Sequence, residues 1–396
     1  MKQTGFLSKA AVLVFVVVSL LLATGTRDGC AADTIKIGHI CSVTGWAGML
    51  GTPQRDALLA VVEDINKKGG LLGKQVEAFI EDDQSNPTTA SIAATKLIKD
   101  TKVSVLIGTT ISDSGMAVSP IAERERIPFF LTTPVVLPWD RLKWTFAIGP
   151  GDEKMAVHVL ELAVKQLGAQ HIALLHDTTL YGNSGAKIFN AEIGKYPGTS
   201  IIMEEKYEVQ DTSMVPQLTK IKAAKPDLLV IYGTGAPAAV VAKNYKQLGM
   251  TVPVLGAGGL GGPDFLKLAG NIADEGNWAI AVLKISIAEK LPFSDPYRKN
   301  VYEPAKKIFQ DKYGKDKGGL NVFHVSPMDA FTMATMGMKA AGTDDRAKLR
   351  EALEKVRFTA LLGGRVIPQP DNHIRDCEDS SELALFKNGE FVPYAK

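Results

Sequence analysis

Residues 35–80 read IKIGHICSVTGWAGMLGTPQRDALLAVVEDINKKGGLLGKQVEAFI, and they give the clearest indication of fold class. Apolar runs at residues 35–40 and 76–80 predict two buried strands. Between them, residues 56–66 carry apolar side chains along one stripe, as an amphipathic helix does, and Gly69 follows where a left-handed helix cap is favoured. Strand, helix and strand in this order predict a right-handed βαβ unit and a parallel sheet.

The same alternation continues along the chain. Further strands are predicted at residues 103–107, 129–131, 172–175, 201–203, 228–232 and 252–255. Further helices are predicted at residues 88–99, 155–167 and 236–248. The series restarts near Gly149-Pro150-Gly151, so the simplest interpretation is two similar sheets in tandem. The predicted fold class is α/β, with two doubly wound parallel-sheet lobes.

The C-terminal third divides between the two predicted lobes. It contains two helical blocks and two short strand-like pieces, at residues 296–313, 327–341, 365–366 and 383–385. We expect three hinge crossings between the lobes, near residues 150, 282 and 366. The predicted organisation is lobe 1 at residues 33–149 plus 283–365, and lobe 2 at residues 150–282 plus 366–396.

The N-terminus has the pattern of an export signal. Two lysines precede an uncharged apolar run at residues 10–23, which is shorter than the roughly 20 residues of a membrane span. Small residues follow, which predicts a signal peptide at residues 1–32, cleaved after Ala32. Cys30 offers an alternative as a lipid-anchored cysteine, although Arg27 stands where a lipoprotein motif has an aliphatic residue. Either interpretation places the protein outside the cytoplasm, in the periplasm.

Charge and cysteine content exclude several classes of protein. The formal net charge is +2, and the first 32 residues hold all of it, so the body is neutral and lacks the basic face that nucleic acid requires. The cysteines left after cleavage, Cys41 and Cys377, make no disulfide framework, and whether they pair stays open. No cysteine and histidine cluster indicates a metal, and we expect no cofactor.

Several segments, in order, resemble the type I periplasmic binding proteins, specifically the leucine/isoleucine/valine-binding receptors of ABC transporters. The segments that match are Ile35-Lys36-Ile37-Gly38, Val43-Thr44-Gly45, residues 62–73, Glu81-Asp82-Asp83-Gln84-Ser85-Asn86-Pro87, Leu106-Ile107-Gly108, Ile127-Pro128, His176-Asp177 and Tyr181-Gly182. The resemblance runs from about Asp33 to the C-terminus. It implies a clamshell that binds a small-molecule solute, lies in the periplasm and serves a membrane permease. We expect a monomer.

Five candidate site residues follow from this resemblance. Ser112 aligns with the family's carboxylate-binding serine, and the loop before the helix predicted near it suits an anion because helix N-termini offer free N–H groups. The alternative is that Ser112 or a neighbour only caps that helix. Thr133, then Thr132, and Val135 belong to the second carboxylate-binding loop. Tyr181 aligns with a cleft tyrosine, with packing at a lobe edge as its alternative.

The remaining candidates concern ligand choice. Trp46 offers a stacking face in a glycine-flanked loop, or simply packs. Gly258 stands where amino-acid receptors carry the acid that holds the ligand's ammonium group, Gly235 replaces a family tyrosine, and Met328 replaces a pocket aromatic. A buried, unpaired ammonium is costly. We therefore expect a carboxylic acid with an apolar or aromatic body, unless Asp177 or Asp211 supplies the counter-charge.

Three alternatives of function stay open. The first is a receptor for branched-chain or other amino acids. The second is a ligand sensor that docks a chemoreceptor or a kinase, using the same cleft. The third is an NAD-dependent enzyme, because residues 256–261 satisfy G-x-G-x-x-G after an apolar run. That motif also requires a helix directly after it and an acid about 20 residues further on. Here Pro263 begins a new segment soon after the glycines, so the sequence does not meet this requirement. We expect no enzyme.

Overall fold

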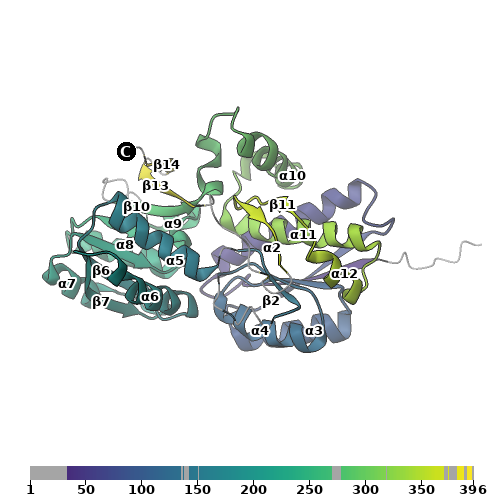
Figure 1. Cartoon of the computed structure of the whole chain (residues 1–396), viewed down its shortest axis with the longest axis horizontal. Coiled ribbons are helices and arrows are strands. Elements are labelled where there is room, and N and C mark those ends of the chain that lie inside the picture. The colour runs from purple at the N-terminus through teal and green to yellow at the C-terminus, as the bar shows by residue number, and fades with distance from the viewer. Residues whose placement is uncertain are drawn as a thin grey trace, which may run out of the picture. The chain divides into compact units, whose positions relative to one another are not determined.

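Two β-sheets organise the chain (Figure 1). The computed structural model describes residues 34–134, 137, 142–149, 151–269, 278–317, 319–369, 373, 381–387 and 390–394. The first sheet has the order β2-β1-β3-β4-β5, and every pair in it is parallel. Its strands are β1 (Ile35–Cys41), β2 (Val76–Asp82), β3 (Val105–Gly108), β4 (Phe129–Leu131) and β5 (Thr145–Ala147).

The second sheet has the order β14-β13-β10-β9-β8-β6-β7. Its strands are β6 (His171–Asp177), β7 (Ser200–Tyr207), β8 (Leu228–Tyr232), β9 (Val254–Gly256), β10 (Trp278–Leu283), β13 (Ser381–Lys387) and β14 (Glu390–Pro393). The five strands from β6 to β10 are parallel, whereas β13 and β14 run antiparallel at one edge. Both sheets are of the predicted α/β type.

Helices cover both faces of the first sheet. They are α2 (Gly48–Lys67), α3 (Pro87–Lys96), α4 (Ser112–Glu125), α10 (Glu303–Tyr313), α11 (Val322–Ala341) and α12 (Arg346–Leu353). Successive side chains of a strand point to opposite faces. Ile37 of β1 therefore joins the core formed with α2, α10, α11 and α12, whereas Ile40 joins the core formed with α3 and α4. Figure 1 shows α11 beside α2 and α12, which both contact it.

The second sheet is covered in the same way. Its helices are α5 (Asp152–Glu161), α6 (Leu180–Glu192), α7 (Val215–Ala224), α8 (Gly235–Gln247) and α9 (Pro263–Ala269). One core contains α5 and α6, and the core on the opposite face contains α7, α8 and α9. This arrangement leaves the carboxyl ends of the parallel strands uncovered by these helices, which is where open α/β sheets bind ligands.

Some predicted elements need correction. Strands β5, β10 and β14 were not predicted, and the second sheet is not wholly parallel. Residues 365–366 form β12 (Arg365–Val366), which pairs only with β11 (Phe358–Thr359), as a separate two-stranded sheet. Helix α2 begins at Gly48, eight residues before the predicted start at residue 56. The predicted lobe boundaries stay predictions.

One short segment packs into both cores. Residues Lys284–Lys290 form 3₁₀ turns directly after β10. Ile285 is buried in the core that contains α2 and α11, whereas Ile287 is buried in the core of the second sheet. Lys290 also forms an ion pair with Glu390 of β14. The segment is therefore packed against both halves of the fold, and its role as a hinge crossing stays a prediction.

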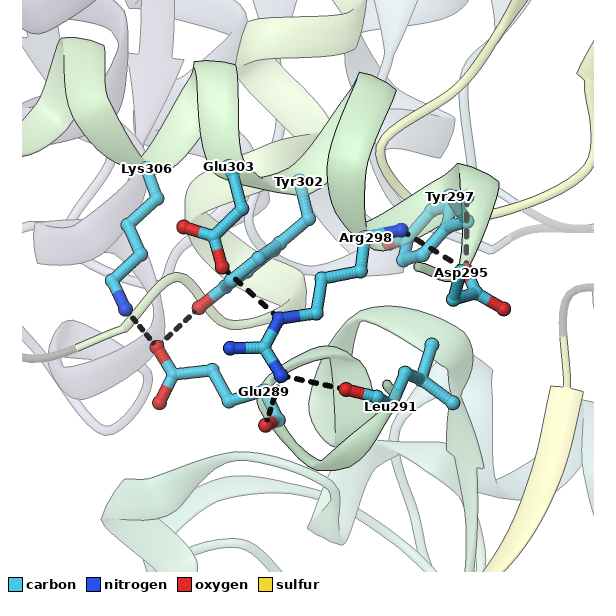
Figure 2. Close-up of polar contacts among 8 residues, drawn as sticks. All are labelled: Glu289, Leu291, Asp295, Tyr297, Arg298, Tyr302, Glu303 and Lys306. Carbon is cyan, nitrogen blue, oxygen red and sulfur yellow. Dashed lines mark hydrogen bonds and ion pairs between the residues drawn. The ribbon is translucent and has the colours of Figure 1, made fainter. Parts of the chain in front are cut away.

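Arg298 fixes this segment to the helical region that follows it (Figure 2). Its guanidinium donates to the backbone carbonyls of Glu289 (2.8 Å) and Leu291 (2.6 Å) and to the carboxylate of Glu303 (3.1 Å). The Glu289 carboxylate accepts hydrogen bonds from Tyr302 (2.7 Å) and Lys306 (2.5 Å). One guanidinium therefore joins the end of the segment Lys284–Lys290 to the helical region that follows it.

Arg298→Met should lower the free energy of unfolding by about 1–2 kcal/mol, because three acceptors lose their donor. The midpoint of urea unfolding measures this change. Lys307→Met is the matched control, since Lys307 and Asp311 form an exposed pair on α10, and such pairs contribute about 0–1 kcal/mol. Equal midpoints for the two variants would show that the Arg298 contacts add nothing to stability.

Candidate functional site

A cleft lies where loops from the carboxyl ends of both sheets meet, and its atoms surround about 780 Å³, part of it open to solvent. Residues from the first-sheet side that line it include Trp46, Leu50, Gln54, Thr110, Ser112, Asp113, Thr132 and Thr133. Residues from the second-sheet side include Met155, Thr179, Tyr181, Thr234, Gly258 and Gly259. Val322, Phe323 and Ser326 of α11 complete one wall.

The N-terminus of α4 lies at this cleft. Ser112 is the first helical residue, after Ile111 in an extended conformation, and no side chain caps this end. The alternative that Ser112, Asp113 or Ser114 serves as the helix cap is therefore not what the structure has. The first N–H groups of a helix have no partner within it and carry a partial positive charge. They suit an anionic group bound in the cleft.

Thr133 presents a hydroxyl without a partner. The residue is 6% exposed, and its Oγ1 is buried with no hydrogen-bond partner among the described residues. The Thr132 hydroxyl instead donates to the carbonyl of Thr109 (2.7 Å), and the Ser112 hydroxyl donates to the carbonyl of Pro134. Of the three predicted hydroxyls, those of Ser112, Thr132 and Thr133, only that of Thr133 is free to donate a hydrogen bond to a ligand.

Gly115 of α4 lets Thr133 lie against the helix. A Cβ atom placed on Gly115 would lie 3.2 Å from Thr133 Oγ1 and 2.6 Å from Leu131 Cδ1. A larger residue at position 115 would therefore require Leu131 and Thr133 to shift. The unpartnered Thr133 hydroxyl and the unpaired N–H groups of α4 therefore lie on one side of the cleft.

The predicted aromatic residues also line the cleft. Trp46 is half-buried and packs beside Leu50 and Ile111, so it both packs and faces the site. Tyr181 is 6% exposed, and its ring lies 4.7 Å from that of Tyr232, centroid to centroid. Each residue thus packs against neighbours and also lines the cleft, and its contact with a ligand stays a prediction. Val135 lies outside the described residues.

The glycine candidates and Met328 lie in different places. Gly258 lines the cleft, and a Cβ atom built on it would approach nothing closer than 3.5 Å. Gly235 lines a smaller neighbouring pocket that shares Leu50 and Phe323 with the cleft. Met328 does not line the cleft: it is 2% exposed and belongs to the core of the first sheet, so this prediction is corrected.

Asp113 is the one charged residue among the described residues that line the cleft. Its Oδ2 accepts a hydrogen bond from the backbone N–H of Leu180 (3.2 Å), the first residue of α6. A carboxylate at a helix N-terminus is stabilised by the helix dipole. The contact joins the α4 side of the cleft to the α6 side, and the carboxylate of Asp113 already has a favourable partner.

The two acids considered as ammonium partners lie elsewhere. Asp177 is fully buried below the first turn of α6, where its Oδ1 accepts from the Thr179 N–H (3.1 Å) and the Thr179 hydroxyl. Burial raises the pKa of the Asp177 carboxyl to about 6, and the hydrogen bonds from Thr179 oppose that rise. Asp211 accepts from the Glu208 N–H (2.9 Å) and does not line the cleft.

Several residues that line the site were not predicted. Gln54, Met155 and Phe323 belong to helices and Leu283 is the last residue of β10, so the rule that ligands contact loops after strands does not find them. One feature of the sequence indicates Gln54. It lies four residues after Leu50 and four before Leu58, on the buried stripe of α2, where a polar residue is unusual.

Other features of the described residues carry no separate site. No group of three or more histidine, cysteine, aspartate or glutamate side chains there could hold a metal. No helix among them is both long and apolar enough to cross a bilayer. The motif at residues 256–261 forms a 3₁₀ turn, Gly258–Leu260, and the seven-residue helix α9 begins only at Pro263. Cys41 is a buried free thiol, and Cys377 lies outside the described residues.

Comparison with known proteins finds relatives over nearly the whole chain. A curated relative is the "Leucine-, isoleucine-, valine-, threonine-, and alanine-binding protein" of Pseudomonas aeruginosa. It is 27% identical over 336 residues, 84% of this chain and 85% of its own. An extracellular ligand-binding receptor from Rhodopseudomonas palustris HaA2 has a TM-score of 0.82 at 27% identity, covering 91% of this chain and 99% of its own.

A third relative shares the fold. It is the solute-binding protein of an ABC transporter from Rhodopseudomonas palustris, solved in complex with benzoate. Its TM-score is 0.77 at 22% identity, and the match covers 92% of this chain and 96% of that one. The family model described as "Periplasmic binding protein" matches residues 34–381. The chain therefore belongs to the periplasmic binding protein family.

Proposed function

We propose that this protein is the periplasmic receptor of an ABC importer and that it binds a small carboxylic acid with an apolar body between two lobes. The observation that carries the proposal is the distribution of free donors and charges in the cleft. Thr133 and the first turn of α4 offer hydrogen-bond donors to an anion. Among the described residues one carboxylate lines the cleft, that of Asp113, and it accepts a hydrogen bond from the N-terminus of α6.

The walls of the cleft suit an apolar ligand body. Trp46, Leu50, Met155, Leu283 and Phe323 line it, and no lysine or arginine does so among the described residues. An aromatic ring that buries roughly 150–250 Å² at about 25 cal/mol/Å² gains about 4–6 kcal/mol before ordering costs. Together with a bound carboxylate, this gain supports a dissociation constant in the micromolar range or lower.

The second-sheet side supports an acid without an ammonium group. Gly258 stands where the resemblance implies an acidic residue, and Asp177 and Asp211 do not line the cleft. Burying an ammonium group without a counter-charge costs several kcal/mol. The benzoate complex of one structural relative fits this proposal, because it shows that the fold accepts such an acid.

Closure around the ligand explains how such a receptor works. The open lobes would expose Thr133, and closure about the crossings near residues 150, 282 and 366 would add Tyr181 and its neighbours. A permease would recognise the closed form. Residues 1–32 would direct export and then be removed. A sensor that docks a chemoreceptor or kinase would use the same closure, with another partner.

A receptor for branched-chain amino acids is the second candidate. The name of the Pseudomonas aeruginosa relative favours it, as does the presence of Asp113 in the cleft. In this case Asp113 would leave the Leu180 N–H and pair with the ligand's ammonium group. In both candidates the ligand carboxylate binds at the same site. They differ only in whether the ligand has an ammonium group that pairs with Asp113.

Calorimetric titration of the purified protein distinguishes the two candidates. The panel is leucine, isoleucine, benzoate, 3-phenylpropanoate and 4-methylpentanoate, the last being leucine without its amino group. We expect micromolar binding of at least one of the acids that lack an amine, and leucine to bind more weakly than 4-methylpentanoate. Tight binding of leucine without binding of any simple acid would overturn the proposal in favour of the second candidate.

Gly258→Glu should shift preference toward amino acids. A side chain fits at this position, and a carboxylate there can pair with an ammonium group. We expect leucine to bind about tenfold more tightly than to the wild type, and 4-methylpentanoate to bind less tightly because the charges repel. Gly258→Gln is the matched neutral control. No gain in leucine affinity over Gly258→Gln would contradict the assigned role of this position.

A further inference from the structure

Gln54 is a buried polar residue in a largely apolar wall. It lies on α2, is 1% exposed and lines the cleft. An amide carries one acceptor end and one donor end, and a buried end without a partner costs about 1–3 kcal/mol. The hydrogen bonds around Gln54 decide which end remains for a ligand.

The direction of these hydrogen bonds is fixed by a backbone N–H group. The N–H of Ser42 donates to Thr110 Oγ1 (2.8 Å), and a backbone N–H can only donate. The single hydroxyl hydrogen of Thr110 is then free to donate to the amide oxygen Oε1 of Gln54 (2.6 Å). Because the oxygen end of the amide is taken, the NH₂ group is the end left over.

The neighbouring hydroxyls do not use this NH₂ group. Within the described part of the chain no acceptor for this NH₂ group is found, and two other hydroxyls of the cleft donate to backbone carbonyls. Thr234 donates to Gly259 (3.2 Å) and Ser326 donates to Val322 (2.9 Å). The cleft therefore holds a second oriented donor besides that of Thr133.

The two donors, Gln54 Nε2 and Thr133 Oγ1, lie near the ends of different strands. Ser42 follows β1, Thr110 follows β3 and Thr133 follows β4, and β3 lies between the other two strands. Gln54 is held at the β1–β3 side, so it lies one to two strand spacings from Thr133, roughly 5–10 Å. Two donors that bind the two oxygens of one carboxylate can lie up to roughly 7 Å apart, because each hydrogen bond adds about 2.9 Å. Over the larger part of this range, one carboxylate at Thr133 therefore leaves the Gln54 amide for a second oxygen.

We propose that Gln54 Nε2 donates to a second oxygen of the ligand, on the apolar body and away from the carboxylate. The ligand class is then an oxygenated acid: a ring or chain carboxylic acid that bears an oxo, hydroxyl or alkoxy group. This proposal rests on the proposed function, because it takes the carboxylate to lie at Thr133. It adds a specificity-determining residue that selects among acids of equal size.

The test uses pairs of acids matched in size that differ by one acceptor oxygen. Methoxybenzoate and ethylbenzoate form such a pair, taken at the 2-, 3- and 4-positions, and phenylpyruvate with 3-phenylpropanoate extends the series. The readout is the ratio of dissociation constants within a pair. We expect the wild type to prefer the oxygenated member by about tenfold in at least one pair, because sites with a buried donor reject ligands without an acceptor.

Gln54→Glu removes the donor with little change in shape. Its carboxylate still accepts from Thr110 and so retains that hydrogen bond, and we expect the preference within the pair to disappear. The added charge should weaken binding of both acids of a pair equally, and such a loss does not change the ratio of their dissociation constants. Gln54→Leu should also abolish the preference, and Ser91→Ala should leave it unchanged, since the Ser91 hydroxyl donates to the Pro87 carbonyl of its own helix α3 (3.0 Å) and does not line the cleft.

The outcomes separate this inference from the proposed function. Binding of both members of every pair with equal affinity would overturn the role of Gln54 and leave the proposed function intact. A preference that survives in Gln54→Glu and Gln54→Leu would also overturn it. If the wild type binds no acid of the series, the proposed function fails, and this inference fails with it.

Discussion

Thr133→Val should weaken binding of the preferred carboxylic acid by about 10- to 150-fold, because hydrogen bonds to charged groups contribute about 1.5–3 kcal/mol. Valine has nearly the shape of threonine, so packing against Gly115 is retained. The Thr133 hydroxyl has no partner among the described residues, and its removal breaks no internal hydrogen bond there. Calorimetric titration measures the loss.

Ser326→Ala provides the control in the same cleft. The Ser326 hydroxyl lines the site but donates to the Val322 carbonyl of its own helix. We expect less than a threefold change in affinity and a melting temperature close to that of the wild type. If Thr133→Val binds the acid as tightly as Ser326→Ala does, Thr133 is not the anion donor.

Asp177→Asn should change how stability depends on pH. Burial raises the pKa of Asp177 to about 6 in the folded protein, whereas the pKa of an aspartate side chain in an unfolded chain is about 4. Between these values the folded state holds a proton that the unfolded state has lost. Stability contributed by this group is therefore full at low pH and falls as pH rises toward 6, by on the order of 3 kcal/mol.

Urea unfolding at pH 4, 5, 6 and 7 measures this effect as the difference between wild type and variant. Asparagine keeps the oxygen that accepts from Thr179 and has no charge to bury. We expect Asp177→Asn to gain stability over the wild type as pH rises from 4 to 6, with a constant difference above that. Asp316→Asn, at an exposed acid, is the control. Parallel profiles for Asp177→Asn and the wild type would contradict the raised pKa.

The sequence predicted most of the fold because long apolar runs identify buried parallel strands. Strand β8 and strand β4 have the predicted bounds. The three-residue strand β5 has too short a run to be distinguished from a loop. Strand β10 is continuously apolar but was not predicted, and its end at residue 283 coincides with the predicted crossing near 282.

The start of α2 explains the main omission in the site. Its first turns contain Gly48, Gly51 and Pro53, residues that the sequence rules assign to loops. Tertiary packing against α11 overrides that tendency. Because the helix starts earlier than predicted, Leu50 and Gln54 lie on a helix surface that faces the cleft instead of in a loop.

Ser112 and Thr133 were candidates because of the resemblance to the receptor family, and their role in binding stays a prediction. The topology explains why they lie together, because they come just after the adjacent parallel strands β3 and β4, at one edge of the sheet. Which hydroxyl is free depends on hydrogen bonds between loops that no pattern encodes, such as that from Thr132 to Thr109. Met328 was misassigned because Ser326, two positions earlier on the same helix, lines the cleft while Met328 is buried in the core.

The structure of the complex with the tightest-binding acid tests the central claim most directly. We predict that a ligand carboxylate oxygen lies about 2.5–3.2 Å from Thr133 Oγ1, at the N-terminal turn of α4. We also predict that the Asp113 carboxylate stays on the Leu180 N–H. A carboxylate bound away from this turn, or an ammonium group held by Asp113, would contradict the account.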